Sequence, residues 1–283
     1  MLKFPWYFLC FLWIIIPACD LSPKKNVSSS IHHKVILAGS TSIEPIAEKL
    51  AEHYMEHHPG YKIEVQGGGS SAGIQAAKMG AADIGMSSRS LKKEEKIFWE
   101  HTIAFDAIVI IINPANGIQN LTLSQIQKIF SSQITCWSDI DKSRSGKITV
   151  ITREEGSGTR GAFEELIMHK TEISPRCLVQ DSTGAVREIV ASDPNAIGYV
   201  SFGGLNEQVK GVCIEGIPPK MQNMITSDLS QKYRIIRPFL FLTSKTPSLE
   251  CIQFIEFIQS TEGQKILQEE GLIPSYEKIR KHD

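Results

Sequence analysis

The sequence predicts an α/β fold with a mostly parallel sheet. Two observations support this: short apolar, β-branched runs alternate with amphipathic helical segments, and Gly/Ser/Thr turns recur where a strand ends and a helix begins. The chain has 283 residues, a formal net charge of -1 and 42% hydrophobic residues, enough for one large or two medium cores. No excess or run of positive charge favours nucleic acid as a partner.

The N-terminal residues 1–18 are expected to be a lipoprotein signal peptide. Lys3 precedes an apolar run, Trp6–Ile16, that is shorter than the roughly 20 residues of a membrane-spanning helix. The run ends just before Cys19, where we expect cleavage and lipid attachment. A plain secretory signal is the alternative. Either way, the protein is expected in the periplasm or at the cell surface.

Residues 19–30 are polar and serine-rich, and we expect them to form a flexible tether between the lipid anchor and the fold. Asp20 favours the inner membrane if the host is enteric-like. The later cysteines lack the CxxC spacing of metal or redox sites, and the sequence leaves open whether they are free thiols or disulfides. They are Cys136, Cys177, Cys213 and Cys251.

The strands and helices are predicted from their apolar spacing. Strands are expected at residues 34–38, 61–65, 83–86, 103–113, 148–151, 196–200, 209–214 and 235–243. Helices are expected after the turns that end near residues 42, 73 and 159, and at 123–130, 182–191, 249–258 and 261–270. Because the turns follow strands, they should gather at the carboxyl edge of the sheet, where such folds bind ligands.

The turn at residues 153–159 carries the first functional hypothesis. Ser157, Gly158 and Thr159 are predicted at a helix N-terminus, whose first N–H groups have no partner within the helix. Together with the positive end of the helix dipole and Arg153, they suit a small oxyanion. An ordinary helix cap with a surface arginine is the alternative. Two similar turns, at Gly39–Ser42 and Gly67–Gly73, favour the anion site.

Five motifs together resemble the phosphate-binding proteins of bacterial phosphate-specific ABC importers, from about residue 34 to the end. They are Gly39–Ser42, Gly67–Gly73, Ala82–Arg89, Ile111–Pro114 and Arg153–Arg160.

The resemblance implies a two-lobed periplasmic binding protein of type II whose chain crosses twice between lobes. One lobe would comprise residues 31–113 plus 236–283, and the other residues 114–235. It implies a monomer that is not an enzyme. Such a protein would hold phosphate without metal or cofactor and deliver it to the membrane permease subunits of an ABC importer.

The resemblance also implies a set of phosphate-binding residues and an acidic residue, Glu155, that steadies the arginine. Ser88 departs from family members that have aspartate there to accept the proton of hydrogen phosphate. Asp106, a lone charge in an apolar strand, is our candidate for that role, and a structural aspartate is the alternative. Arg89 would bind phosphate or form a surface salt bridge. The expected phosphate-binding residues are Thr41, Ser42, Ser70, Ser88, Arg89, Arg153, Ser157, Gly158 and Thr159.

Other functions remain open at this point. Residues 69–73 satisfy the G-x-S-x-G pattern of serine hydrolases, with Ser71 as nucleophile, but no later histidine lies in a suitable setting. Residues 67–72 approximate a dinucleotide fingerprint without the acidic residue that should follow. An adhesin or structural role is possible on this fold. Within the binding class, the ligand could instead be sulfate, molybdate or arsenate.

Overall fold

The computed structural model describes residues 33–275, and the predictions for the signal peptide, the tether and Cys19 lie outside the described residues. The described residues belong to one compact unit. Its α-helices are α1 Glu44–His57, α2 Ser70–Lys78, α3 Leu123–Phe130, α4 Gly158–Phe163, α5 Thr183–Ser192, α6 Met221–Ile225, α7 Leu249–Gln259 and α8 Thr261–Glu269. Its strands are β1 His33–Gly39, β2 Tyr61–Gly67, β3 Ile84–Ser87, β4 Trp99–Ile112, β5 Asn120–Leu121, β6 Thr149–Arg153, β7 Leu178–Gln180, β8 Ala196–Ser201, β9 Lys210–Gly211, β10 Cys213–Ile214, β11 Ile236–Thr243 and β12 Ile273–Pro274.

The predicted alternation of strands and helices is confirmed, and α3 has the predicted bounds. Local signals account for this agreement. Pro45 occupies the first turn of α1, where its missing N–H costs nothing. Thr122 caps α3 by accepting a hydrogen bond from the Gln125 N–H. The short strand β7 was not predicted, because three residues carry too little pattern to identify a strand.

The strands of the main sheet follow the order β2-β1-β3-β11-β4-β8-β6-β7. β1 is parallel to β2 and β3, and β6 is parallel to β7 and β8. β11 is antiparallel to both β3 and β4, and β4 is antiparallel to β8. The expectation of a mostly parallel sheet is therefore wrong for the middle of the sheet. There β11, from late in the chain, inserts between β3 and β4 in the opposite direction.

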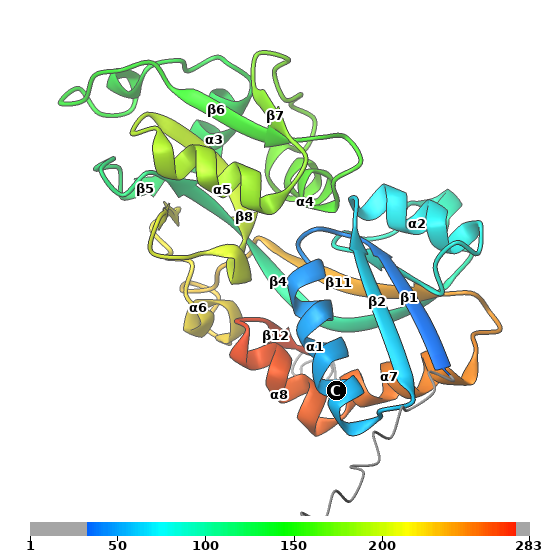
Figure 1. The fold of residues 1–283 in the computed structure, drawn as a ribbon. Helices are drawn as coiled ribbons and strands as arrows, with labels where there is room; N and C mark the ends of the chain where they lie inside the picture. Colours follow the sequence, from blue (N-terminus) through cyan, green and yellow to red (C-terminus); the bar gives the residue numbers. More distant parts are fainter. Residues whose placement is uncertain (1–32, 276–283) are drawn as a thin grey trace, which may run out of the picture. The chain divides into compact units, whose positions relative to one another are not determined.

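The long strand β4 belongs to both parts of this sheet. Its residues up to Ala107 pair with β11, and Ile108–Ile112 pair with β8 (Figure 1). The pairing with β11 places Asp106 opposite Arg237. This register brings two charged residues together inside strands that are otherwise apolar.

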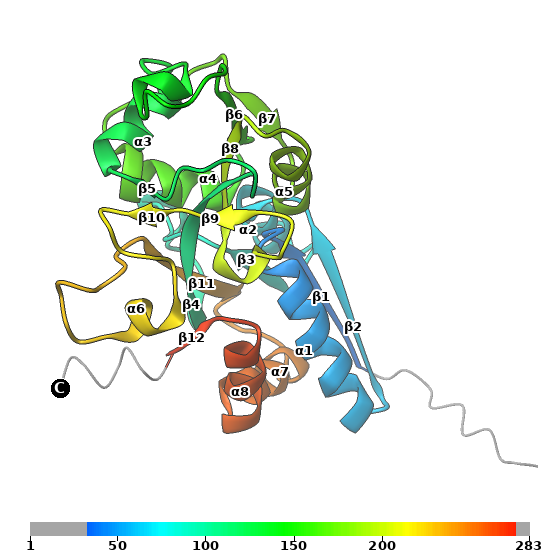
Figure 2. The same cartoon turned by 90° about the vertical axis from the view of Figure 1, so that its left-hand side faces the viewer.

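The fold contains two large hydrophobic clusters. One contains buried residues from the ranges 35–104 and 239–272, including residues of β1, α1, α7 and α8. α7 and α8 lie side by side in this part of the fold (Figure 2). The other contains buried residues from the range 107–235 together with Ile273, including residues of α3, α4 and β8.

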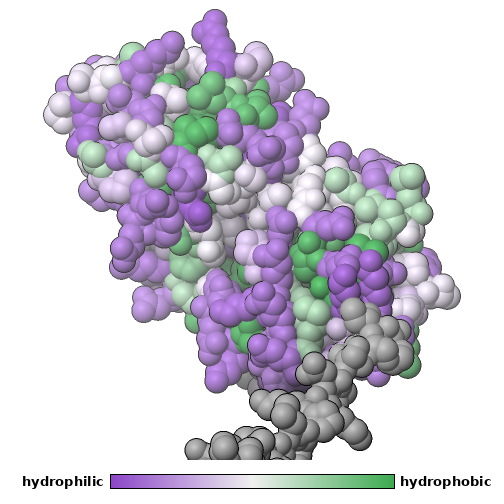
Figure 3. Space-filling view, viewed as in Figure 1, coloured by the Kyte–Doolittle hydropathy of each residue, from purple (hydrophilic) through white to green (hydrophobic). Residues whose placement is uncertain are grey.

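The surface is mostly hydrophilic in the view of Figure 3, with hydrophobic residues in small patches. None of the helices within residues 33–275 has the length and apolar character needed to cross a bilayer. The cysteines that the sequence left unassigned are free thiols in the structure. They are Cys136, Cys177, Cys213 and Cys251.

The helix α2 packs closely on β1 through Gly73. A Cβ atom at this position would lie 2.4 Å from the Ala38 carbonyl oxygen and 2.5 Å from Gly39 Cα, both of them backbone atoms. By contrast, a Cβ atom at Gly184 in α5 would have no heavy atom within 4 Å, among those counted outside its own helix and chain neighbours.

We therefore expect Gly73→Ala to lower the free energy of unfolding by about 1–3 kcal/mol, the usual cost of overpacking. Gly184→Ala is the matched control and should be neutral or stabilising by about 0.5–1 kcal/mol, because alanine favours helix. Chemical denaturation of both variants measures the difference. Equal stability of the two variants would contradict this account of the α2–β1 contact.

Candidate functional site

The turns that follow β1, β6 and β7 meet through their hydroxyl groups. Ser42 Oγ, from the turn before α1, lies 2.8 Å from Thr159 Oγ1 at the start of α4. It also lies 3.1 Å from Thr183 Oγ1, the first residue of α5. All three side chains are buried. Residues more than 100 positions apart in sequence therefore share one hydrogen-bonded cluster.

The turns that follow β2 and β3 reach the same hydrogen-bonded cluster. Ser40 Oγ donates to Ser88 Oγ over 2.8 Å, and the Ser88 N–H donates to Ser70 Oγ over 3.0 Å. A Cβ atom on Gly158 would lie 2.1 Å from Ser70 Oγ, so this position must be glycine for α4 to approach α2. The predicted residues Ser70, Ser88 and Gly158 are thus brought together.

Arg153 ends β6 and is only 1% exposed. Its Nη2 donates to Thr41 Oγ1 over 3.2 Å and to the Asp181 carbonyl over 2.9 Å. The prediction that Glu155 is the acidic partner of Arg153 is wrong. Glu155 is exposed, and Glu154 instead receives two hydrogen bonds from Arg153, over 2.9 and 3.0 Å.

A buried tyrosine supports the end of β6. Tyr199 Oη lies 2.8 Å from Thr152 Oγ1 and accepts a hydrogen bond from the Arg153 N–H over 3.2 Å. Its ring stacks on Phe163 of α4 at 4.1 Å. Burial raises the pKa of Tyr199 to about 12, so the phenol stays protonated. Tyr199 therefore fixes the backbone that carries Arg153.

A second buried arginine, Arg237 of β11, was missed by the sequence analysis. Its Nη1 donates to Thr159 Oγ1 over 2.8 Å and to the Ser88 carbonyl over 3.1 Å. The Asp106 carboxylate receives a 2.9 Å hydrogen bond from its Nε and forms a 2.8 Å ion pair with its Nη2. A lone arginine in an apolar strand was the available signal, the same signal that drew attention to Asp106.

Asp106 uses both carboxylate oxygens for contacts within the protein. Oδ1 accepts hydrogen bonds from Ser201 Oγ over 2.7 Å and from the Phe202 N–H over 3.1 Å, while Oδ2 faces Arg237. Burial raises the pKa of Asp106, and the Arg237 guanidinium opposes that shift. This geometry favours a role in holding Arg237 over the proton-accepting role that the sequence suggested.

Arg89 lies at the edge of the cluster. Its guanidinium forms two hydrogen bonds with the Glu95 carboxylate, over 2.7 and 2.8 Å, and its Nη2 lies 3.5 Å from Ser71 Oγ. The hydrogen bonds from Arg89 lower the pKa of Glu95, so this carboxylate stays ionised. The salt-bridge alternative for Arg89 therefore describes its contacts, although Arg89 is buried and its partner Glu95 is partly buried, so the pair does not lie on the open surface.

Helix N-termini add backbone N–H groups to these side chains. α1, α2, α4 and α5 all begin at the turns described above, and α5 was not assigned to the site from the sequence. Ser157 caps α4 by accepting a hydrogen bond from the Arg160 N–H, and α4 continues into a π-helical turn, Glu164–Met168. Positive dipole ends, hydroxyls and two buried guanidinium groups at one place suit an anion with several oxygen atoms.

Known proteins share this fold. Residues 26–262 match the family model of the PBP superfamily domain. A phosphate ABC transporter substrate-binding protein from Clostridium perfringens, crystallised with bound phosphate, is 37% identical and has a TM-score of 0.80. The alignment covers 85% of this chain and 99% of that one. An ABC-type phosphate transport receptor from Vibrio cholerae is 36% identical, with a TM-score of 0.69 and coverage of 84% and 99%.

The phosphate-binding protein PstS of Bacillus subtilis is 29% identical over 275 residues, which are 92% of this chain and 90% of that protein. This chain belongs to the PBP superfamily, and within it to the PstS phosphate-binding proteins. The predicted fold class of a periplasmic binding protein is thereby confirmed. Membership in this family also agrees with the expectation of a binding protein rather than an enzyme.

The buried Asp106–Arg237 pair has a measurable consequence for stability. Asp106→Ala leaves Arg237 buried without its carboxylate, and we expect a loss of about 3–5 kcal/mol in the free energy of unfolding. Adding Arg237→Met removes the unpaired charge and should restore most of that loss. Urea denaturation of the single and double variants tests this. A double variant no more stable than Asp106→Ala would show that the pair does not act as a unit.

Proposed function

We propose that the protein binds inorganic phosphate outside the cytoplasm and delivers it to the permease of an ABC importer. The observation that supports this most strongly is the meeting of four helix N-termini, a cluster of hydroxyls and two buried arginines. Such groups replace the hydration shell of phosphate with charge-assisted and backbone hydrogen bonds, and these are strong where water is excluded. The relative from Clostridium perfringens carries bound phosphate on a similar fold.

The proposed ligand contacts are the nine residues expected from the sequence, with Thr183 and Arg237 added. Arg153 and Arg237 supply the positive charge, since both guanidinium groups reach the hydroxyl cluster. Arg89 is proposed to act more weakly, because Glu95 binds its guanidinium. Each arginine has its own carboxylate, so the site is expected to rely on directed hydrogen bonds more than on net charge.

Two lobes are proposed to enclose the ligand and to close by a hinge motion. The two hydrophobic clusters support this division, because one takes its residues from 35–104 and 239–272 and the other mainly from 107–235. We propose that the crossings lie near Asp106 in β4 and near Arg237 in β11, a few residues from the boundaries expected at 113 and 236.

We propose that the N-terminal residues attach the protein to the membrane. The signal peptide would direct export and be cleaved before Cys19, and a lipid on Cys19 with the tether would then keep the binding protein at the membrane, near the permease subunits. We expect a monomer that needs no cofactor and does not bind nucleic acid. The hydrolase alternative is weakened, because a serine nucleophile needs a histidine to activate its hydroxyl. Ser71 Oγ faces Arg89, and no histidine within residues 33–275 forms a hydrogen bond with Ser71.

Arg153→Ala should weaken phosphate binding by at least tenfold, which corresponds to about 1.4 kcal/mol or more. The reason is that it removes a buried guanidinium whose Nη2 reaches the ligand-side hydroxyls. Arg89→Ala is the control and should cost less. Calorimetric titration with phosphate, sulfate, arsenate and molybdate measures both affinity and selectivity. Unchanged affinity in Arg153→Ala would remove this residue from the site.

Asp106→Asn distinguishes two roles of this carboxylate. If Asp106 positions Arg237, phosphate and sulfate affinities should fall by similar factors, because both anions use the same guanidinium. If Asp106 accepts the phosphate proton, phosphate should lose more than sulfate, which carries no such proton. We expect the affinity ratio to stay constant within about twofold. Competition titrations on the folded variant measure this ratio.

A further inference from the structure

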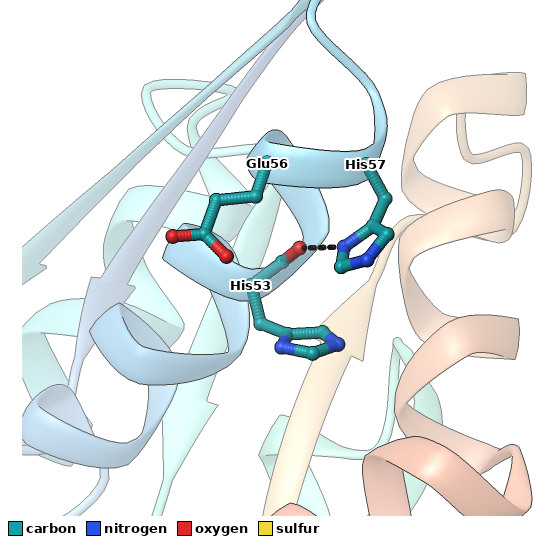
Figure 4. A group of neighbouring side chains, drawn as sticks. All are labelled: His53, Glu56 and His57. Carbon is teal, nitrogen blue, oxygen red and sulfur yellow. Dashed lines mark hydrogen bonds between the residues drawn. The ribbon is translucent and has the colours of Figure 1, made fainter.

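The C-terminal end of α1 carries a cluster of potential metal ligands to which the sequence analysis assigned no role. His53, Glu56 and His57 each offer one ligand atom, and these atoms all lie within 4.8 Å of one another (Figure 4). We propose that these residues bind a divalent transition-metal ion, with Zn²⁺ as the natural probe. This inference is independent of the proposed phosphate function.

The spacing of the three residues explains why they meet. Residues separated by three and four positions share one face of an α-helix, so His53, Glu56 and His57 project from the same side of α1. Two histidines at positions i and i+4 form a known zinc-binding arrangement. Zn²⁺ bonds of about 2.0–2.2 Å require the donor atoms to come closer than they lie now. Small rotations of the exposed Glu56 and His57 side chains can bring the donor atoms closer.

The hydrogen bond of His57 fixes which ring nitrogen is free to bind a metal ion. His57 Nδ1 lies 2.9 Å from the His53 carbonyl oxygen (Figure 4). A carbonyl oxygen only accepts, so Nδ1 carries the proton and the neutral ring presents its lone pair on Nε2. Metal-binding histidines commonly donate their second ring N–H to a carbonyl or carboxylate in this way.

His53 is held by a carboxylate from another helix. Its Nε2 lies 2.8 Å from Glu262 Oε1 of α8, and its ring stacks on Phe257 of α7 at 5.7 Å. Because the carboxylate accepts the Nε2 proton, the neutral His53 ring presents Nδ1 as the ligand atom, and Glu262 orients the ring. A bound ion would therefore be linked through His53 and Glu262 to a second helix.

The donor set selects the class of ion. Two imidazoles with one carboxylate suit Zn²⁺, Ni²⁺ or Cu²⁺, whereas Mg²⁺ and Ca²⁺ prefer sites made of oxygen atoms. The cluster also lies apart from the anion site. His53 and His57 follow Ser42 by 11 and 15 positions, roughly 16–23 Å along the helix axis. A metal ion at this end of α1 should leave the phosphate ligands in place.

The test is calorimetric titration of the purified, tag-free chain with ZnCl₂ at pH 7.5 in phosphate-free buffer. We expect one ion per chain and a rise in Tm on Zn²⁺ addition, because a ligand of the folded state stabilises it. His53→Ala and His57→Ala should each weaken binding by about 100-fold or more. Glu262→Gln should weaken it by about tenfold, as loss of a supporting partner does.

His58→Gln is the matched control. His58 is exposed and adjacent to His57, and its Nδ1 likewise bonds to a backbone carbonyl, that of Tyr54, but it is not part of the cluster and its ring stacks on Tyr54 at 4.0 Å. Zn²⁺ binding and phosphate affinity should be unchanged in this variant, and phosphate affinity should also be unchanged in the other three. Absence of Zn²⁺ binding, binding that survives both histidine-to-alanine variants, or equal loss in His58→Gln would overturn the proposal. Zn²⁺ bound by the free thiols would survive in the histidine variants.

Discussion

The antiparallel register of β4 and β11 places Asp106 opposite Arg237, and the proposed binding site depends on this buried ion pair. A guanidinium group cannot be buried without a partner except at a cost of several kcal/mol. Asp106 supplies that partner, and Ser201 and the Phe202 N–H in turn hold Asp106. The Nη1 group of Arg237 then reaches Thr159 and the Ser88 carbonyl, which belong to turns from different parts of the sheet.

The same design recurs at the other arginines of the site. Glu154 accepts hydrogen bonds from Arg153, and Glu95 accepts hydrogen bonds from Arg89. A carboxylate in direct contact holds each guanidinium in place and neutralises much of its charge. Selectivity for an oxyanion must then come from the direction of hydrogen bonds, in which hydroxyls and helix N–H groups present donors from several sides. Binding by directed hydrogen bonds does not require a positively charged chain, so it is compatible with the formal net charge of -1.

The proposed metal cluster follows a different chemical logic. The anion site collects donor groups from turns that are distant in sequence, whereas His53, Glu56 and His57 are neighbours on one helix. The two ends of α1 would thus bind ions of opposite charge, with the N-terminal end near the anion and the C-terminal end near the cation. This arrangement agrees with the direction of the helix dipole.

Local chemistry was enough to predict much of this protein. Glycine, serine and threonine after an apolar run indicate a helix start, and the spacing of apolar residues indicates the helix that follows, so the turns with Ser42, Ser70 and Thr159 could be identified from sequence alone. The partners of the charged groups could not be identified from the sequence. Asp106 stood out as a lone charge, but Arg237 lies 131 residues away, and only strand register brings the two together. Glu154 and Glu155 are adjacent acidic residues, and only the path of the chain after β6 decides which one faces Arg153. The sequence by itself determined which turns offer anion-binding groups, because those groups depend on local backbone conformation. Tertiary structure decided how each charge is neutralised, because that depends on contacts between segments distant in the chain.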